Sequence, residues 1–205
     1  HRCFVAEVMG RKCGYLSLMS GLATGAEKVY LNEEGITLAG LAADSERMVE
    51  SFRSGRSLYL VIRNERASVN YTTDVLAHIF AEEGKGLYDV REAILGHQQQ
   101  GGSPTAFDRI MATKLVAHSL ELLACALKRG EPTASYVGLM GGKVSDQPLD
   151  RMNDDLDRDH RRPRHQWWLG LRPAVGLVSQ DIGTLTLQDV PDFGEAVDDA
   201  ASDQR

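Results

Sequence analysis

Residues 3–15 have the sequence CFVAEVMGRKCGY, and this stretch decides the fold class. The run from Cys3 to Val8 has the composition of a buried strand, and Gly10 marks its end. A segment of helical period follows over 12–26, although two internal glycines weaken it. A strand that passes directly into a helix is the repeating unit of an α/β domain with a parallel sheet.

The same alternation continues along the chain. Further strands are expected over 28–31, 58–62 and 89–95, with a last core strand over 136–139. Helices are expected over 37–52, from Thr72 or Thr73 to 83, and over 108–128, with Thr37 as the cap of the first of them. Gly141 and Gly142 are expected to form a turn.

The character of the sequence changes after Asp146. Residues 150–164 mix both charge signs densely, as in a solvated connector. An apolar patch, expected to dock back onto the body, consists of Trp167, Trp168, Leu169 and Leu171. Residues 181–205 are acidic and poor in large apolar side chains, which predicts a disordered tail. We therefore expect one α/β domain over 1–180 and a tail over 181–205.

Composition limits the class of protein. The formal net charge of −6 argues against nucleic acid as a partner, and no apolar run suggests a membrane span. The three cysteines form no CxxC pattern, so we expect reduced thiols in a cytoplasmic protein and no zinc site. Because the chain opens with His1 directly before an apolar strand, we treat it as part of a longer protein.

The segment 95–104, with the sequence LGHQQQGGSP, is the strongest candidate for a binding loop. Its glycines allow the backbone to approach a ligand closely. His97, Gln98, Gln99 and Gln100 can donate hydrogen bonds to hydroxyls or phosphate oxygens. The same composition also fits a tight strand-to-helix turn with solvent-facing amides.

A second candidate is Met9-Gly10-Arg11, which lies between a strand and a helix. Ligands of α/β proteins bind at the carboxyl ends of strands, and a helix start offers free amide donors to an anion. The alternative is a glycine required by the chain direction followed by a surface arginine.

Isolated polar residues complete the set of candidates. Arg2, Arg91 and Arg161 have the planar donor geometry that suits phosphate, and Glu65 follows an apolar strand where it could accept hydrogen bonds from sugar hydroxyls. The alternative for Glu65 is an acidic loop residue, and most isolated arginines are simply solvated.

The sequence contains neither GxxxxGK[ST] nor GxGxxG, and no clustered acids in a glycine-rich turn. No aspartate is placed as a base for a hydroxyl nucleophile. We therefore predict no catalytic and no metal-binding residue in this chain.

Several of these segments resemble phosphofructokinases, in the same order. Residues 4–15 resemble the family's VVEVMGRxCGxL, and 95–109 resemble LGHxQxGGSPxxFDR. Shorter runs at 63–65, 70–74, 82–86 and 160–168 resemble the carboxyl-terminal half of the duplicated eukaryotic enzyme. The resemblance covers about residues 1–178.

The resemblance implies a doubly wound, mostly parallel α/β fold that binds sugar phosphates. It implies that Met9, Gly10, Glu65 and His97 hold the sugar. Positions that match Arg2 and Arg91 reach in from a neighbouring subunit, and Arg161 matches a contact to a second phosphate. These residues would form a site for fructose 2,6-bisphosphate or fructose 6-phosphate.

Two positions separate the regulatory from the catalytic halves of the family. Gln100 resembles the regulatory halves, because catalytic halves carry arginine there. Arg11 resembles the catalytic halves. The resemblance thus implies the regulatory half of a glycolytic ATP- and Mg²⁺-dependent 6-phosphofructokinase, a homo-oligomer expected as a tetramer, whose ATP and Mg²⁺ segments have no counterpart here. The alternative is a non-catalytic sugar-phosphate-binding or assembly module that is inactive alone.

Overall fold

The computed structural model describes residues 1–130 and 132–179. These residues fall into two compact units, one formed by His1–Gly101 with the segment from Trp168, the other by Gly102–Trp167. The expected single domain over 1–180 stays a prediction, and the expected tail over 181–205 lies outside the described residues.

The first unit is a parallel sheet with helices on both faces, which confirms the predicted fold class. Its strand order is β2-β3-β1-β4. In chain order its elements are β1 (Arg2–Val8), α1 (Tyr15–Thr24), β2 (Lys28–Tyr30), α2 (Leu38–Arg53), β3 (Leu58–Asn64), α3 (Thr73–Gly84), β4 (Asp89–Ile94), the 3₁₀ turn η1 (Gly96–Gln99), η3 (Trp167–Leu171) and α6 (Ala174–Val178).

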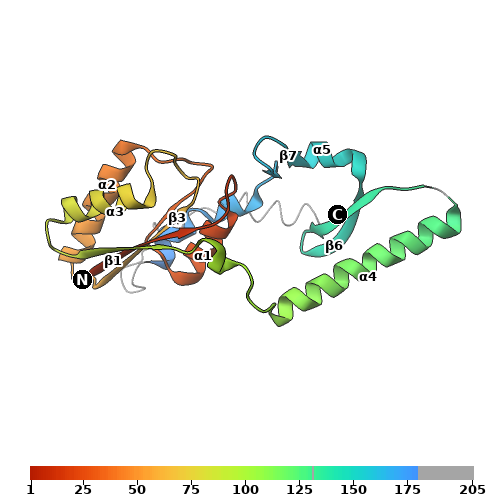
Figure 1. Ribbon diagram of the computed structural model, residues 1–205, viewed down its shortest axis with the longest axis horizontal. Helices are drawn as coiled ribbons and strands as arrows, with labels where there is room; N and C mark the ends of the chain where they lie inside the picture. The colour runs from red at the N-terminus through yellow and green to blue at the C-terminus, as the bar shows by residue number, and fades with distance from the viewer. Residues whose placement is uncertain (131, 180–205) are drawn as a thin grey trace. The chain divides into compact units, whose positions relative to one another are not determined.

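The strand order fixes the face on which each helix lies. The connection from β1 passes over β3 to reach β2, whereas the connections after β2 and β3 run in the opposite direction. Because crossovers between parallel strands are right-handed, the reversal sends the later helices to the other face. Figure 1 shows this result, with α2 and α3 on one side of the strands and α1 on the other.

Alternation along the strands produces two apolar clusters, one per face. Cys3, Val5 and Val61 pack against α2 and α3. Val8 and Ile62 point the other way, towards α1. Cys3 is fully buried, and burial raises the pKa of its thiol to about 12, so it packs as a neutral side chain. The cysteines are free, as predicted.

Helix starts follow from capping chemistry. Thr37 accepts a hydrogen bond from the amide of Gly40, as predicted, and of the two candidates for α3 it is Thr72 that accepts one from Val75. The first helix begins at Tyr15, later than the predicted residue 12, because Gly10 and Cys13 close a turn before it.

The second unit contains α4 (Ala106–Arg129), β5 (Ser135–Met140), β6 (Lys143–Pro148), η2 (Leu149–Arg151), α5 (Met152–Asp155), β7 (Leu156–Asp157) and β8 (Arg162–Pro163). Figure 1 shows α4 running along the β5–β6 hairpin. The predicted connector over 150–164 therefore contains short regular elements.

The prediction of a last core strand over 136–139 was wrong. The strand exists, but β5 pairs antiparallel with β6 in a separate two-stranded sheet. Gly141 and Gly142 both have positive φ, which is the geometry of a tight hairpin turn. That turn brings the polar segment from Lys143 back along β5.

Helix α4 begins at Ala106, two residues before the predicted start, because Thr105 and Asp108 form a reciprocal capping box. By length and composition it is apolar enough to cross a membrane, contrary to the expectation from sequence. The charged residues Lys114 and Glu121 lie within its apolar sequence. A single helix of this kind is weak grounds for a membrane span, and the expectation of no membrane partner stays a prediction.

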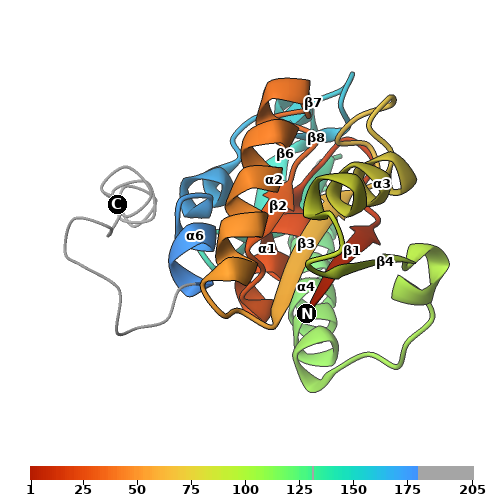
Figure 2. The same ribbon diagram turned by 90° about the vertical axis from the view of Figure 1, so that its left-hand side faces the viewer.

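Three residues of the apolar patch near the carboxyl end, Trp168, Leu169 and Leu171, pack within the first unit as predicted. Trp168, 3% exposed, packs in the α1-side cluster, and its ring meets Tyr15 edge-on. Leu169 and Leu171 contact the same cluster, and α6 packs against α1 and β2 (Figure 2). Trp167 belongs to the second unit and is 55% exposed, so its predicted docking stays a prediction.

We expect Trp168→Ala to lower the free energy of unfolding by about 3–5 kcal/mol, because it removes a large buried side chain and leaves a cavity. Urea unfolding followed by circular dichroism measures the change. Trp167→Ala is the matched control and should change the free energy by only about 0.5 kcal/mol. Equal losses in the two variants would show that Trp168 does not anchor this segment.

Candidate functional site

The reversal of chain direction makes a topological switch point between β1 and β3. These strands are neighbours, and the segments that follow them lead to helices on opposite faces of the sheet. In α/β proteins such a switch point is where ligands bind. The segments after β1, β3 and β4 all leave the sheet at its carboxyl edge, and they carry the predicted residues 9–11, 65 and 97–100.

The carboxylate of Glu65 lies at this switch point. Its Oε1 accepts a hydrogen bond from the amide of Gly10 at 3.3 Å and one from the amide of Arg11 at 2.7 Å. The amide of Glu65 itself donates to the carbonyl of Val8 at 3.0 Å. Glu65 thereby joins the segment after β3 to the segment after β1, and Oε2 remains outside these hydrogen bonds.

A glycine is required at position 10. Its φ of +154° is rarely adopted by residues with side chains, and a Cβ there would lie 2.5 Å from the carbonyl oxygen of Cys13 and 2.6 Å from Nδ2 of Asn64. Asn64 uses that nitrogen to donate to the same carbonyl at 3.2 Å. The close approach of two backbone segments, rather than access for a ligand alone, accounts for this glycine.

Arg11 adopts a left-handed backbone conformation with φ of +42°, and its side chain is exposed. Such a conformation is uncommon for a residue other than glycine, and it persists where the surroundings fix it. Here the hydrogen bond from the Arg11 amide to Glu65 fixes the backbone.

Gln99 links the segment after β4 to the segment after β1. Its Oε1 accepts a hydrogen bond from the amide of Met9 at 2.7 Å. The expected loop forms the short turn η1, in which the amide of Gln98 donates to Leu95 and that of Gln100 to His97. The side chains of His97, Gln98 and Gln100 are exposed.

The structure does not bring every predicted residue to this edge. Arg2 begins β1, about 20 Å along the strand from its carboxyl end. Arg91 lies within β4, paired with Phe4, and 3.9 Å separates its Nη2 from Oδ2 of Asp89. Arg161 lies in the second unit, between β7 and β8, with φ of +53°. Their predicted contacts with phosphate stay predictions.

Three residues of the site escaped the sequence analysis as individual residues, namely Glu7, Arg63 and Asn64. Glu7 and Arg63 are paired across β1 and β3, and their side chains interact at 2.7 Å. A signal was available, because both occupy the inward phase of apolar strands, where opposite charges have to pair.

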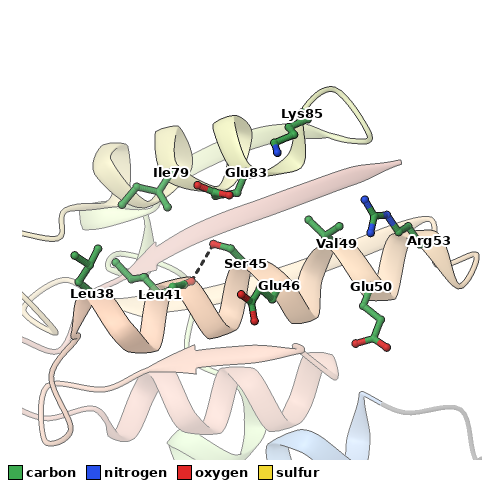
Figure 3. Close-up of a pocket in the computed structure, with 11 residues that line it drawn as sticks. Leu38, Leu41, Ser45, Glu46, Val49, Glu50, Arg53, Ile79, Glu83 and Lys85 are labelled. Carbon is green, nitrogen blue, oxygen red and sulfur yellow. Dashed lines mark hydrogen bonds between the residues drawn. The ribbon is translucent and has the colours of Figure 1, made fainter.

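A separate hollow of about 830 Å³ lies between α2 and α3, away from these segments. Figure 3 shows it lined by apolar side chains such as Leu41, Val49 and Ile79 together with charged ones. Ser45 points into this region, but its hydroxyl donates to the carbonyl of Leu41 at 2.9 Å. This hollow contains none of the predicted site residues.

We expect Gln99→Ala to speed hydrogen exchange of the Met9 amide about fivefold, because a hydrogen bond worth about 1 kcal/mol is lost. Exchange resolved to single amides by mass spectrometry measures it. Gln98→Ala, in the same turn, is the control and should leave Met9 unchanged. Equal exchange of Met9 in the Gln99 variant and wild type would remove this tie from the site.

Comparison with known proteins identifies the family. The sequence profile described as "Phosphofructokinase" matches residues 1–123. The chain is 39% identical over 189 residues to the muscle-type ATP-dependent 6-phosphofructokinase of Canis lupus familiaris, covering 87% of this chain and 24% of that protein. It is 43% identical over 190 residues to the ATP-dependent 6-phosphofructokinase of Dictyostelium discoideum, covering 92% and 22%.

Solved structures of phosphofructokinases are also similar to this chain. Phosphofructokinase from Saccharomyces cerevisiae superposes with a TM-score of 0.81 at 34% identity, over 87% of this chain and 25% of that one. The chain thus spans about a quarter of the length of the relatives it matches. With the parallel sheet and these matches in agreement, the chain belongs to the phosphofructokinase family.

Proposed function

We propose that this chain is part of an ATP-dependent 6-phosphofructokinase, a glycolytic enzyme of the cytoplasm, and that it binds a phosphosugar at the carboxyl edge of its sheet. The parent enzyme transfers the γ-phosphoryl group of ATP to the 1-hydroxyl of fructose 6-phosphate with Mg²⁺. The names of the relatives support the activity, and the switch point supports the binding role.

The observation that carries the binding role is the convergence of three tied segments around Glu65. Oε1 of Glu65 is engaged by the amides of Gly10 and Arg11, which leaves Oε2 as an acceptor for a sugar hydroxyl. The exposed side chains of His97 and Gln100 supply donors beside it. The ties hold the acceptor in place before a ligand arrives, which lowers the entropic cost of binding.

Within residues 1–130 and 132–179, no three His, Cys, Asp or Glu side chains come together to hold an ion. Mg²⁺ needs no such set, because one or two carboxylates and the phosphates of a substrate can hold it. In this proposal phosphoryl transfer belongs to other parts of the parent enzyme, because the ATP and Mg²⁺ segments of the resembling family have no counterpart in this sequence. This segment is regulatory, and its ligand is fructose 2,6-bisphosphate.

Gln100 supports an effector site, because catalytic halves of the resembling family carry arginine at that position. A second candidate is a substrate-type site for fructose 6-phosphate, which Arg11 favours. Arg11 and Gln100 both lie in exposed turns and point into solvent. An effector site and a substrate-type site can therefore use the same backbone framework.

The placement of Arg2 and Arg91 supports assembly of the parent chain into a homo-oligomer. Both lie off the carboxyl edge of their own sheet, so they would reach a bound phosphate only in a neighbouring subunit. A bisphosphate that bridges them and Arg161 would stabilise one quaternary arrangement over another, which is a population shift.

We expect Arg91→Ala in the full-length parent protein to weaken binding of fructose 2,6-bisphosphate by about 1.5–3 kcal/mol, the range for a hydrogen bond to a charged group. Isothermal titration calorimetry measures the affinity. Arg53→Ala, which changes an arginine of α2, is the control and should bind as wild type does.

Unchanged affinity in the Arg91 variant would remove Arg91 from the site. Wild-type binding of fructose 6-phosphate without binding of the bisphosphate would establish the substrate-type site in place of the effector site. If neither sugar phosphate binds, the proposed function is wrong.

A further inference from the structure

Arg63 is a charged residue in the core of the first unit, with 1% of its surface exposed. It lies on the same face of β3 as Tyr59 and Val61, which belong to the apolar cluster beneath α2 and α3. An arginine in such a place costs free energy unless its donors are satisfied. Burial lowers the pKa of Arg63, and the neighbouring carboxylate of Glu7 raises it again.

The guanidinium of Arg63 is satisfied mainly by the backbone of the segment that carries Glu65. Nη1 donates to the carbonyl of Glu65 at 3.3 Å, Nη2 to that of Ser68 at 2.7 Å, and Nε to that of Tyr71 at 3.1 Å. Three carbonyls spread over seven residues thus converge on one rigid, planar group. The path of the segment from β3 to α3 is set by the donor directions of this side chain.

The charge is balanced on the other side by Glu7. Its Oε2 accepts from Nη1 of Arg63 at 2.7 Å and also from the hydroxyl of Thr73. Glu7 precedes the Met9–Arg11 segment on β1, and Thr73 is the first residue of α3. The network therefore links β1, β3 and α3 directly beneath the site.

Stability alone does not explain such a network. A buried ion pair contributes little net free energy, and well-packed apolar side chains of similar volume often serve as well or better. The network instead orients the backbone, because an apolar side chain could not hold three carbonyls in fixed directions. The position of Glu65 depends on that orientation of the backbone.

We propose that Arg63, held by Glu7 and Thr73, is the positioning residue that sets the carboxylate of Glu65 against the amides of Gly10 and Arg11. The consequence for ligand affinity rests on the proposed function. The consequence for the two amides does not, so the two ideas can fail separately.

The test is a double-mutant cycle in the full-length protein with Arg63→Lys and Glu65→Ala, because alanine removes the oxygen that accepts from the two amides. Lysine keeps the charge but loses the planar fork, so the carboxylate of Glu65 should no longer be held in place. We expect exchange of the Gly10 and Arg11 amides to quicken about tenfold relative to that of Met48 in the core, and affinity for fructose 2,6-bisphosphate to fall about tenfold.

Arg66→Ala is the matched control, an exposed arginine of the same segment, and should change neither quantity. If Arg63 acts through Glu65, adding Arg63→Lys to Glu65→Ala should change the amide exchange little further. Additive effects, or unchanged Gly10 and Arg11 amides in a folded Arg63→Lys protein, would overturn the proposal.

A second pair of variants covers the case in which Arg63→Lys fails to fold. Thr73→Val removes the hydroxyl that donates to Glu7, and Thr73→Ser restores it. We expect faster exchange of the Gly10 and Arg11 amides in the valine variant and recovery in the serine variant. If the valine variant matches wild type, the network does not position Glu65. If wild type binds no sugar phosphate while the amide results hold, only the proposed function fails.

Discussion

The right-handedness of connections between parallel strands is the constraint on which the first unit depends. The chain moves from β1 past β3 to β2 and then returns in two steps, through β3, to β4. Each move in one direction is confined to one face, so the reversal requires two helix layers and two apolar clusters. It also makes a switch point between β1 and β3, where the segments that follow these strands lead to opposite faces.

The segments that diverge after β1 and β3 are joined by hydrogen bonds from side chains to the backbone. The carboxylate of Glu65 and the amides of Asn64 and Gln99 each bind backbone atoms of the segment after β1. Backbone groups at the end of a sheet otherwise have no partner except water. The same side chains therefore satisfy the backbone and fix the geometry of the site.

Much of the first unit follows from local chemistry, which explains why the sequence predicts it. Strands with a period of two, helices with threonine caps and polar residues at the carboxyl ends of strands all depend on neighbours within a few positions. The carboxyl-edge residues 9–11, 65 and 97–100 could be named for that reason. Their mutual hydrogen bonds could not, because those depend on the strand order.

The sequence predictions that were wrong or missing also have physical explanations. β5 has the composition of a core strand, but its partner β6 is the polar segment KVSDQP, which has no apolar pattern to reveal it. Pairing was decided by the tight turn at Gly141 and Gly142. The sequence shows a charge on each of two apolar strands. That Glu7 pairs with Arg63 follows only once β1 and β3 are known to be neighbours in this register.

Some residues of the site bond to the backbone and others face solvent, and this difference bears on how the ligand preference of the site can change. The residues that tie the segments together, such as Glu65 and Gln99, use their side chains for the scaffold. Arg11, His97 and Gln100 point exposed side chains into solvent. Substitutions at exposed positions that make no such contact usually change stability by only about 0.5 kcal/mol, whereas loss of Glu65 or Gln99 removes hydrogen bonds to the backbone. In the proposed scheme, a substrate-type site and an effector-type site can thus differ at positions 11 and 100 while Arg63 and Glu65 keep one common geometry.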